Sequence, residues 1–272
     1  MPTPRKTGYA SINGLQLYYE IHGAGEPLVL LHGGLGSTDT FGPNLPALAA
    51  GRQVVAADLQ AHGRTGDIDR ALTYEAMGDD IAALIGHLGL GRADVMGFSL
   101  GAGVAIRTAI QQPEVVRKLV IVSTPCKRDG WYPEIRAAMS QMTSASAEMM
   151  KPSPVYKNYV RVSPRPDDWP MLLGKIGDML RREYDWSDEI ARITAPMMLV
   201  FADSDSIPVA HIAEFYGLLG GSRLDAGWDG SGMPPNRLAV LPGLTHYNIV
   251  VAPALAATVI PFLDAPVPSP AK

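Results

Sequence analysis

Short apolar runs alternate with longer amphipathic stretches along most of this chain. Because strands buried on both faces of a parallel sheet are apolar throughout, we interpret the short runs as such strands. The runs are Leu28 to Leu31, Gln53 to Ala57, Ala93 to Met96, Lys118 to Ser123 and Met197 to Phe201. Between Thr73 and Gly89 the apolar residues instead recur at helical spacing, which predicts a helix that Thr73 caps and Gly89 ends.

The rest of the chain supplies the remaining elements. Asn13-Gly14 stands between two extended stretches, as in a hairpin turn. Three more helices and one strand are predicted by the pattern: helices over 102–112, 209–219 and 252–263, and a last strand over 238–241. Strands that alternate with helices predict an α/β fold with a mostly parallel sheet and helices on both faces.

Residues 125–193 differ from the flanking sequence, since they are richer in Met, Pro and aromatic residues and lack a clear strand pattern. We interpret them as a helical cap inserted into a core made of residues 1–124 and 194–272. In sheets of this kind the functional groups gather at the carboxyl ends of the strands.

A nucleophile is indicated at Ser99. Gly97-Phe98-Ser99-Leu100-Gly101 matches G-x-S-x-G and lies between a predicted strand and a predicted helix, which is the context that the motif requires. Glycines suit a turn too sharp for side chains, and such a turn places the serine in a strained, exposed conformation. The alternative is a glycine-rich turn that only starts a helix.

The serine hydroxyl needs a base, and the base needs an acid. His246 follows the last predicted strand, so it is the favoured base among six histidines. The turn after the strand at Met197 offers two carboxylates, Asp203 and Asp205. Either could instead cap the following helix, and Asp203, which is nearer the strand, could hydrogen-bond to local backbone. Ile207-Pro208 suggests that this helix begins just after Asp205.

Acyl transfer also needs donors for an oxyanion. His32-Gly33-Gly34 follows a predicted strand, so the Gly34 N–H is one candidate and the Leu100 N–H the other. His32 would then brace the loop. Phe98, Leu35 and Trp131 are expected to contact substrate, and Trp131 is one of the aromatic residues with which the insertion could line the pocket.

With these motifs in place, the chain resembles the α/β-hydrolase family. The matching segments are His32 to Gly34, Asp58 to Gly63, Gly97 to Gly101, Ala202 to Pro208 and Gly243 to His246. The resemblance implies the order Ser99, Asp205, His246, favours Asp205 over Asp203 as the acid, and gives His62 no direct catalytic role. Family members that act on halides and epoxides carry Asp at the nucleophile, so Ser99 argues against those activities.

The composition of the chain limits the kinds of partner that we expect it to bind. The formal net charge is −4 with no cluster of Lys and Arg, so we expect no nucleic-acid partner. No apolar run reaches membrane-spanning length, and no ligand cluster has metal spacing. We expect a cytoplasmic hydrolase of small carboxylic esters that needs no cofactor or metal and does not bind a membrane. The sequence is compatible with either a monomer or a homodimer. The alternatives are a C–C bond hydrolase, a lactonase or a perhydrolase on the same residues, and a ligand receptor with little turnover.

Overall fold

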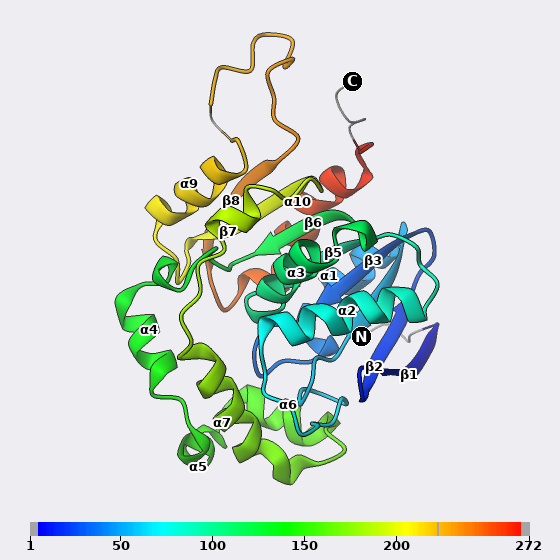
Figure 1. The fold of residues 1–272 in the computed structure, drawn as a ribbon, viewed down its shortest axis with the longest axis vertical. Helices are drawn as coiled ribbons and strands as arrows, with labels where there is room; N and C mark the ends of the chain where they lie inside the picture. The colour runs from blue at the N-terminus through cyan, green and yellow to red at the C-terminus, as the bar shows by residue number, and fades with distance from the viewer. Residues whose placement is uncertain (1–4, 222, 268–272) are drawn as a thin grey trace.

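The computed structural model describes residues 5–221 and 223–267, and these form an eight-stranded sheet flanked by helices (Figure 1). The strand order is β1-β2-β4-β3-β5-β6-β7-β8. The strands are β1 (Lys6–Ile12), β2 (Leu15–His22), β3 (Glu26–Leu31), β4 (Arg52–Ala57), β5 (Ala93–Phe98), β6 (Val116–Val122), β7 (Met197–Ser204) and β8 (Arg237–Thr245).

Most of the sheet is parallel. β3 through β8 pair in parallel, whereas β1 and β2 form an antiparallel hairpin at one edge. Asn13 and Gly14 both have positive φ, 47° and 79°, which is the geometry that a two-residue hairpin turn needs. The predicted fold class is therefore confirmed.

Helices cover both faces because residues along each central strand alternate between two apolar clusters. Val29 and Leu31 pack with α2, α3 and α9 on one face, and Leu28 and Leu30 pack with α1 and α10 on the other. The bounds are α1 (Asn44–Ala49), α2 (Tyr74–His87), α3 (Leu100–Gln111), α9 (Val209–Leu218) and α10 (Pro253–Asp264). Thr73 caps α2 as expected, since its side chain accepts from the Ala76 N–H.

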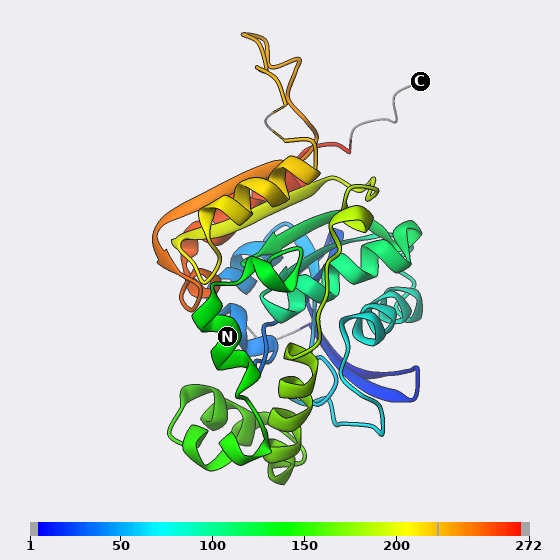
Figure 2. The ribbon, with the colours of Figure 1, turned by 60° about the vertical axis from the view of Figure 1, so that its left-hand side comes forward.

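The chain between β6 and β7 is helical and lies at one end of the sheet (Figures 1 and 2). Residues 125–193 are all described and contribute no strand to the sheet. This segment holds α4 (Pro133–Ser140), α5 (Ala147–Met150), α6 (Pro154–Val162), α7 (Trp169–Leu180) and α8 (Ser187–Ile190), with short 3-10 turns between them.

The last strand is longer than the sequence pattern suggests. The pattern predicts a strand over 238–241, but β8 runs from Arg237 to Thr245. Pro242 cannot donate a backbone hydrogen bond, so it would interrupt the pairing of a central strand. β8 is the edge strand, however, and its register shifts by a bulge opposite Ala202 and Ser204, so the proline and glycine are accommodated.

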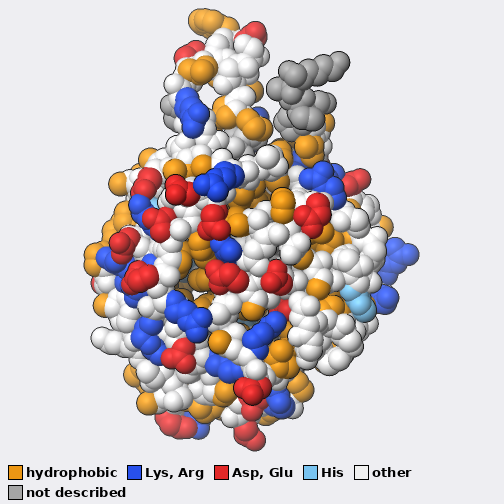
Figure 3. Space-filling view, viewed as in Figure 1, with side chains coloured by type: hydrophobic (Ala, Val, Ile, Leu, Met, Phe, Trp, Pro, Cys, Tyr) orange, Lys and Arg blue, Asp and Glu red, His pale blue; other side chains and the backbone are white. Residues whose placement is uncertain are grey.

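The loop before β8 projects away from the body of the molecule (Figure 1). Apolar side chains gather near its tip, and elsewhere on the face in Figure 3 positive and negative side chains are interspersed. Leu224, Trp228 and Met233 are exposed in this loop. Among the described residues, no helix combines the length and apolar character needed to cross a membrane.

Candidate active site

Ser99 stands alone in the turn between β5, which ends at Phe98, and α3, which begins at Leu100. Its φ of 52° is in the left-handed region, so the expected strained conformation is confirmed, and the side chain is half-buried. The flanking glycines have a steric reason. A Cβ on Gly97 would lie 2.1 Å from the Gly101 carbonyl oxygen, and a Cβ on Gly101 would lie 2.4 Å from the His32 carbonyl oxygen.

His246 reaches the serine from the loop after β8. Its Nε2 lies 3.2 Å from Ser99 Oγ, and its Nδ1 lies 2.9 Å from Asp205 Oδ1. A carboxylate only accepts, so the proton of the neutral imidazole is on Nδ1 and Nε2 is free to accept from the serine hydroxyl. The three side chains thus form one hydrogen-bonded chain from β5, β7 and β8 at the carboxyl ends of the strands.

The Asp205 carboxylate lies just past β7 and is enclosed by donors. Ser123 Oγ is 2.5 Å from Oδ2, the Ala202 N–H donates to the same oxygen, and the Ser206 N–H donates to Oδ1. Burial raises the pKa of Asp205, but the hydrogen bond and charge of His246 and the bonds from Ser123 and Ala202 outweigh it. The net pKa lies below the ordinary value, so the side chain is ionised at neutral pH.

Asp203 has different hydrogen-bond partners from Asp205. Its two carboxylate oxygens accept from the Gly243 and Leu244 N–H groups, over 3.0 and 3.2 Å. The structure therefore places Asp205 against His246 and Asp203 against the backbone at the end of β8, just before His246.

The glycine loop after β3 lies against the nucleophile turn. A Cβ on Gly33 would be 3.4 Å from Ser99 Cβ, and one on Gly34 would be 3.6 Å from Leu100 Cδ1. Leu100 is the first residue of α3, so its N–H has no acceptor within the helix. Both predicted donor segments are thus adjacent to Ser99.

His32 braces this loop as expected. Its Nδ1 bonds to the Gly33 carbonyl oxygen, and its Nε2 accepts from the Leu59 N–H. Burial lowers its pKa to about 3, and the nearby His62 adds to that effect, so the ring is neutral. A neutral ring is what an acceptor at Nε2 requires.

Aromatic side chains enclose the His246 ring. The rings of Phe98 and Trp131 lie 5.3 and 5.5 Å from it, centroid to centroid. Trp131 comes from the start of the helical segment, and its indole N–H donates to the Tyr184 hydroxyl over 3.2 Å. Leu35 is buried in the glycine loop with a φ of 62°. Contact of these three residues with substrate stays a prediction.

Other aromatic residues of the helical segment pack elsewhere. Tyr156 and Tyr159 contact Trp169 inside the segment, and Trp186 stacks on Tyr184. The segment is tied to the core near the glycine loop, because the Asn158 amide donates to Ser37 Oγ and Arg161 pairs with Asp39.

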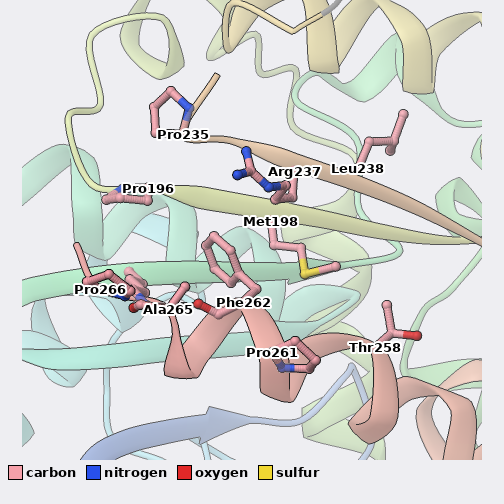
Figure 4. A pocket seen from close by; sticks show the side chains of 11 residues that line it. Pro196, Met198, Pro235, Arg237, Leu238, Thr258, Pro261, Phe262, Ala265 and Pro266 are labelled. Atoms are coloured by element: carbon pink, nitrogen blue, oxygen red, sulfur yellow. Dashed lines mark hydrogen bonds between the residues drawn. The ribbon is translucent and has the colours of Figure 1, made fainter. Parts of the chain in front are cut away.

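A separate cavity of about 330 Å³ lies between β7, β8 and the end of α10 (Figure 4). Its lining is mostly apolar and includes none of Ser99, Asp205 and His246. Lys118 at its edge donates to the carbonyl oxygens of Phe262 and Leu263, so its ammonium caps the helix end. Within residues 5–221 and 223–267, no cluster of three or more His, Cys, Asp or Glu side chains has metal-binding geometry.

Sequence reasoning missed Ser123. It follows β6 directly, and position at the carboxyl end of a strand was the one available signal. Nothing in the local sequence Val122-Ser123-Thr124 indicates that its hydroxyl reaches a carboxylate 82 residues away.

A mostly parallel α/β sheet with a Ser-His-Asp array at its carboxyl edge is the arrangement found in serine hydrolases of the α/β-hydrolase fold. Comparisons with known proteins show the same fold. Residues 26–151 match the family described as alpha/beta hydrolase fold. The crystal structure of E-2-(acetamidomethylene)succinate hydrolase is similar with a TM-score of 0.75, 22% identity, and coverage of 96% of this chain and 99% of that one. A thermophilic esterase from Thermogutta terrifontis has a TM-score of 0.70 at 20% identity, covering 96% and 98%.

A curated relative matches the sequence more closely over a shorter span. The "Putative carbamate hydrolase RutD" of Azorhizobium caulinodans is 36% identical over 123 residues, which cover 45% of this chain and 46% of the relative. The match thus spans just under half of that relative's length. The family match covers residues 26–151, just under half of this chain, and the similarity to solved structures shows that the described residues have the α/β-hydrolase fold.

Proposed function

We propose that this protein is a serine hydrolase that cleaves small carboxylic esters through an acyl-enzyme intermediate. The observation that carries the proposal is the hydrogen-bonded chain from Ser99 Oγ through His246 to Asp205. A strained serine with an acceptor nitrogen 3.2 Å away is arranged for attack on a carbonyl carbon. The family supports hydrolysis, and the esterase similarity favours esters.

The first half of the reaction forms the acyl-enzyme. Ser99 Oγ attacks the ester carbonyl carbon while His246 Nε2 takes the hydroxyl proton, and Asp205 stabilises the resulting imidazolium. The carbonyl oxygen becomes an oxyanion held by the N–H groups of Gly34 and Leu100. When the C–O bond to the leaving alcohol breaks, His246 returns its proton to that oxygen.

The second half releases the acid. A water molecule gives a proton to His246 and attacks the acyl carbon. When the second tetrahedral intermediate collapses, the bond from the acyl carbon to Ser99 Oγ breaks and His246 returns the proton to that oxygen, which releases the acid and restores the Ser99 hydroxyl. Every step uses residues of this chain, so the proposed reaction needs no cofactor or metal. In this proposal residues 125–193 act as the cap that encloses the substrate, with Trp131, Phe98 and Leu35 in contact with it.

Replacing the nucleophile tests the proposal. We expect Ser99→Ala to remove nearly all hydrolysis of a nitrophenyl butyrate ester, because the variant lacks the hydroxyl that forms the proposed acyl-enzyme. The fold should persist, since alanine is smaller than serine and adds no atom to the turn. Turnover is measured beside labelling of Ser99 by a fluorophosphonate and thermal unfolding of both proteins. Normal turnover in the variant, or an unlabelled Ser99 in the parent, would overturn the assignment.

Carbamate hydrolysis is the second candidate, favoured by the 36% identity to the carbamate relative over residues that are nearly half of this chain. An ester and a carbamate with the same leaving group, compared by kcat/KM, decide between the two. The same array also serves C–C bond hydrolysis, lactone opening and perhydrolysis. A hydrolase-fold receptor would instead show close to one turnover per molecule. The cytoplasmic location and the absence of nucleic-acid and membrane partners stay predictions from the sequence.

A further inference from the structure

Donors on both oxygens hold the Asp205 carboxylate, and one of them is a side chain that the reaction above does not use. Ser123 Oγ and the Ala202 N–H lie 2.5 and 3.0 Å from Oδ2. His246 Nδ1 and the Ser206 N–H lie 2.9 and 2.8 Å from Oδ1. Two pairs of donors therefore fix the rotation of the carboxylate plane.

The backbone at Ser123 is strained. Its φ is 53°, in the left-handed region that favours glycine, and its N–H donates to the Val200 carbonyl oxygen over 3.0 Å. The residue is fully buried. Because glycine would fit this backbone with less strain, the backbone does not account for a serine here. The hydroxyl is what serine adds, and in the structure it bonds to Asp205.

We propose that Ser123 is a positioning residue for the hydrolysis, and that its hydroxyl holds the Asp205 carboxylate in the rotation that presents Oδ1 to His246. The inference rests on the proposed function, since it concerns the same Ser-His-Asp array. Ser123 acts through Asp205 and does not touch the reacting atoms. Strained residues cluster where the surrounding structure fixes a functional geometry, and Ser99 and Ser123 both have this property.

Loss of the hydroxyl has two measurable consequences. A hydrogen bond to a charged group is among the stronger kinds in proteins, so kcat should fall by about 10- to 100-fold. KM should change little, because Ser123 makes no contact that holds substrate. His246 is the titratable side chain that hydrogen-bonds to Asp205 among the described residues. A carboxylate that has lost a donor attracts the His246 proton more strongly, so the acid limb of the kcat/KM profile should move to higher pH.

Two variants separate the hydroxyl from the strain. Ser123→Ala removes the hydroxyl and keeps the strained backbone, whereas Ser123→Gly removes the hydroxyl and relieves the strain. Both should show the same fall in kcat and the same shift of the acid limb on a nitrophenyl butyrate ester. Thermal unfolding should find Ser123→Gly at least as stable as Ser123→Ala.

The outcomes are distinct. Unchanged kcat in both variants would overturn the positioning role, and so would normal kcat in Ser123→Gly beside a loss in Ser123→Ala, because stability would then explain the loss. Ser99→Ala is measured in the same assay. If Ser99→Ala is inactive and the Ser123 variants are normal, this inference alone fails. If Ser99→Ala stays active, the proposed function itself fails.

Discussion

Two aspartates separated by one residue have different partners, and their difference is testable at the residue scale. Asp205 accepts from His246, and Asp203 accepts from two backbone amides at the end of β8, just before His246. Asp205→Asn would present an amide that favours the wrong imidazole tautomer. We expect it to lower kcat by roughly 10⁴, as in other triads.

Asp203→Asn is the matched control, since it makes the same chemical change two residues away. An asparagine oxygen can still accept from one of the two amides, so the end of β8 is held less firmly but His246 keeps its hydrogen bond to Asp205. We expect a small loss of kcat and a modest loss of stability. Steady-state kinetics of both variants, with folding checked by circular dichroism, decide the matter; an inactive Asp203→Asn beside an active Asp205→Asn would reverse the roles.

Some residues of the candidate site can be predicted from the local sequence, and others cannot. Ser99, His246 and Asp205 stand at strand ends within recognisable local patterns, so sequence reasoning could name residues that the structure brings together. The hydroxyl of Ser123 meets its partner only through the pairing of β6 with β7. That contact depends on tertiary structure, and no local pattern encodes it.

At the scale of elements, the position of α3, the helix that follows Ser99, depends on close approach of its backbone to the end of β3. A Cβ on Gly101 would meet the carbonyl oxygens of His32 and Leu31 at 2.4 and 2.5 Å. Backbone atoms of a central strand cannot move aside, so α3 would shift away from β3. We expect Gly101→Ala to lower the free energy of unfolding by about 1–3 kcal/mol or more and to reduce kcat sharply.

Gly86 supplies the control for this substitution. It is an exposed glycine near the end of α2, and nothing lies within 4 Å of the position a Cβ would take. Gly86→Ala should be neutral or stabilising by up to about 1 kcal/mol, with kcat unchanged. Denaturant unfolding of the two variants beside the parent tests the comparison; equal stability of Gly101→Ala and the parent would remove the steric reason for the motif glycine.

Element types were predictable where the period was strong, as in α2 and the buried parallel strands. The residues at which elements end were less predictable than the element types. The pattern predicts that the last strand ends at 241, whereas in the structure the edge position of β8 lets the strand continue past Pro242 to Thr245. Edge or centre is a property of the sheet order, which the local sequence does not contain.

At the scale of the whole molecule, two buried histidines couple folding to pH. His32 and His62 are both fully buried, with rings 5.1 Å apart. Burial is the main cause that lowers the pKa of His32 to about 3 and that of His62 to about 4, from an ordinary 6.5. Both rings are therefore neutral in the folded protein well into the acid range.

The unfolded chain takes up protons at these two positions at a higher pH than the folded protein does. Between about pH 6.5 and pH 4 the unfolded chain binds protons at both histidines and the folded protein does not, so stability falls as the pH falls. Each such proton contributes a slope of about 1.4 kcal/mol per pH unit in this window. Above pH 6.5 both states are neutral at these positions, and the two histidines contribute no pH dependence.

Replacing one histidine tests this coupling. His62 Nδ1 bonds to the Gln60 carbonyl oxygen over 2.8 Å, and an asparagine amide can donate from nearly the same place. His62→Asn should therefore lose some packing at all pH values, while its unfolding free energy falls less steeply below pH 6 than that of the parent, by about one proton's slope. Denaturant unfolding at half-unit steps from pH 7.5 to 4.5 measures both slopes. Parallel curves for parent and variant would mean that His62 is protonated equally in the folded and unfolded states, and that acid lability has its origin elsewhere in the molecule.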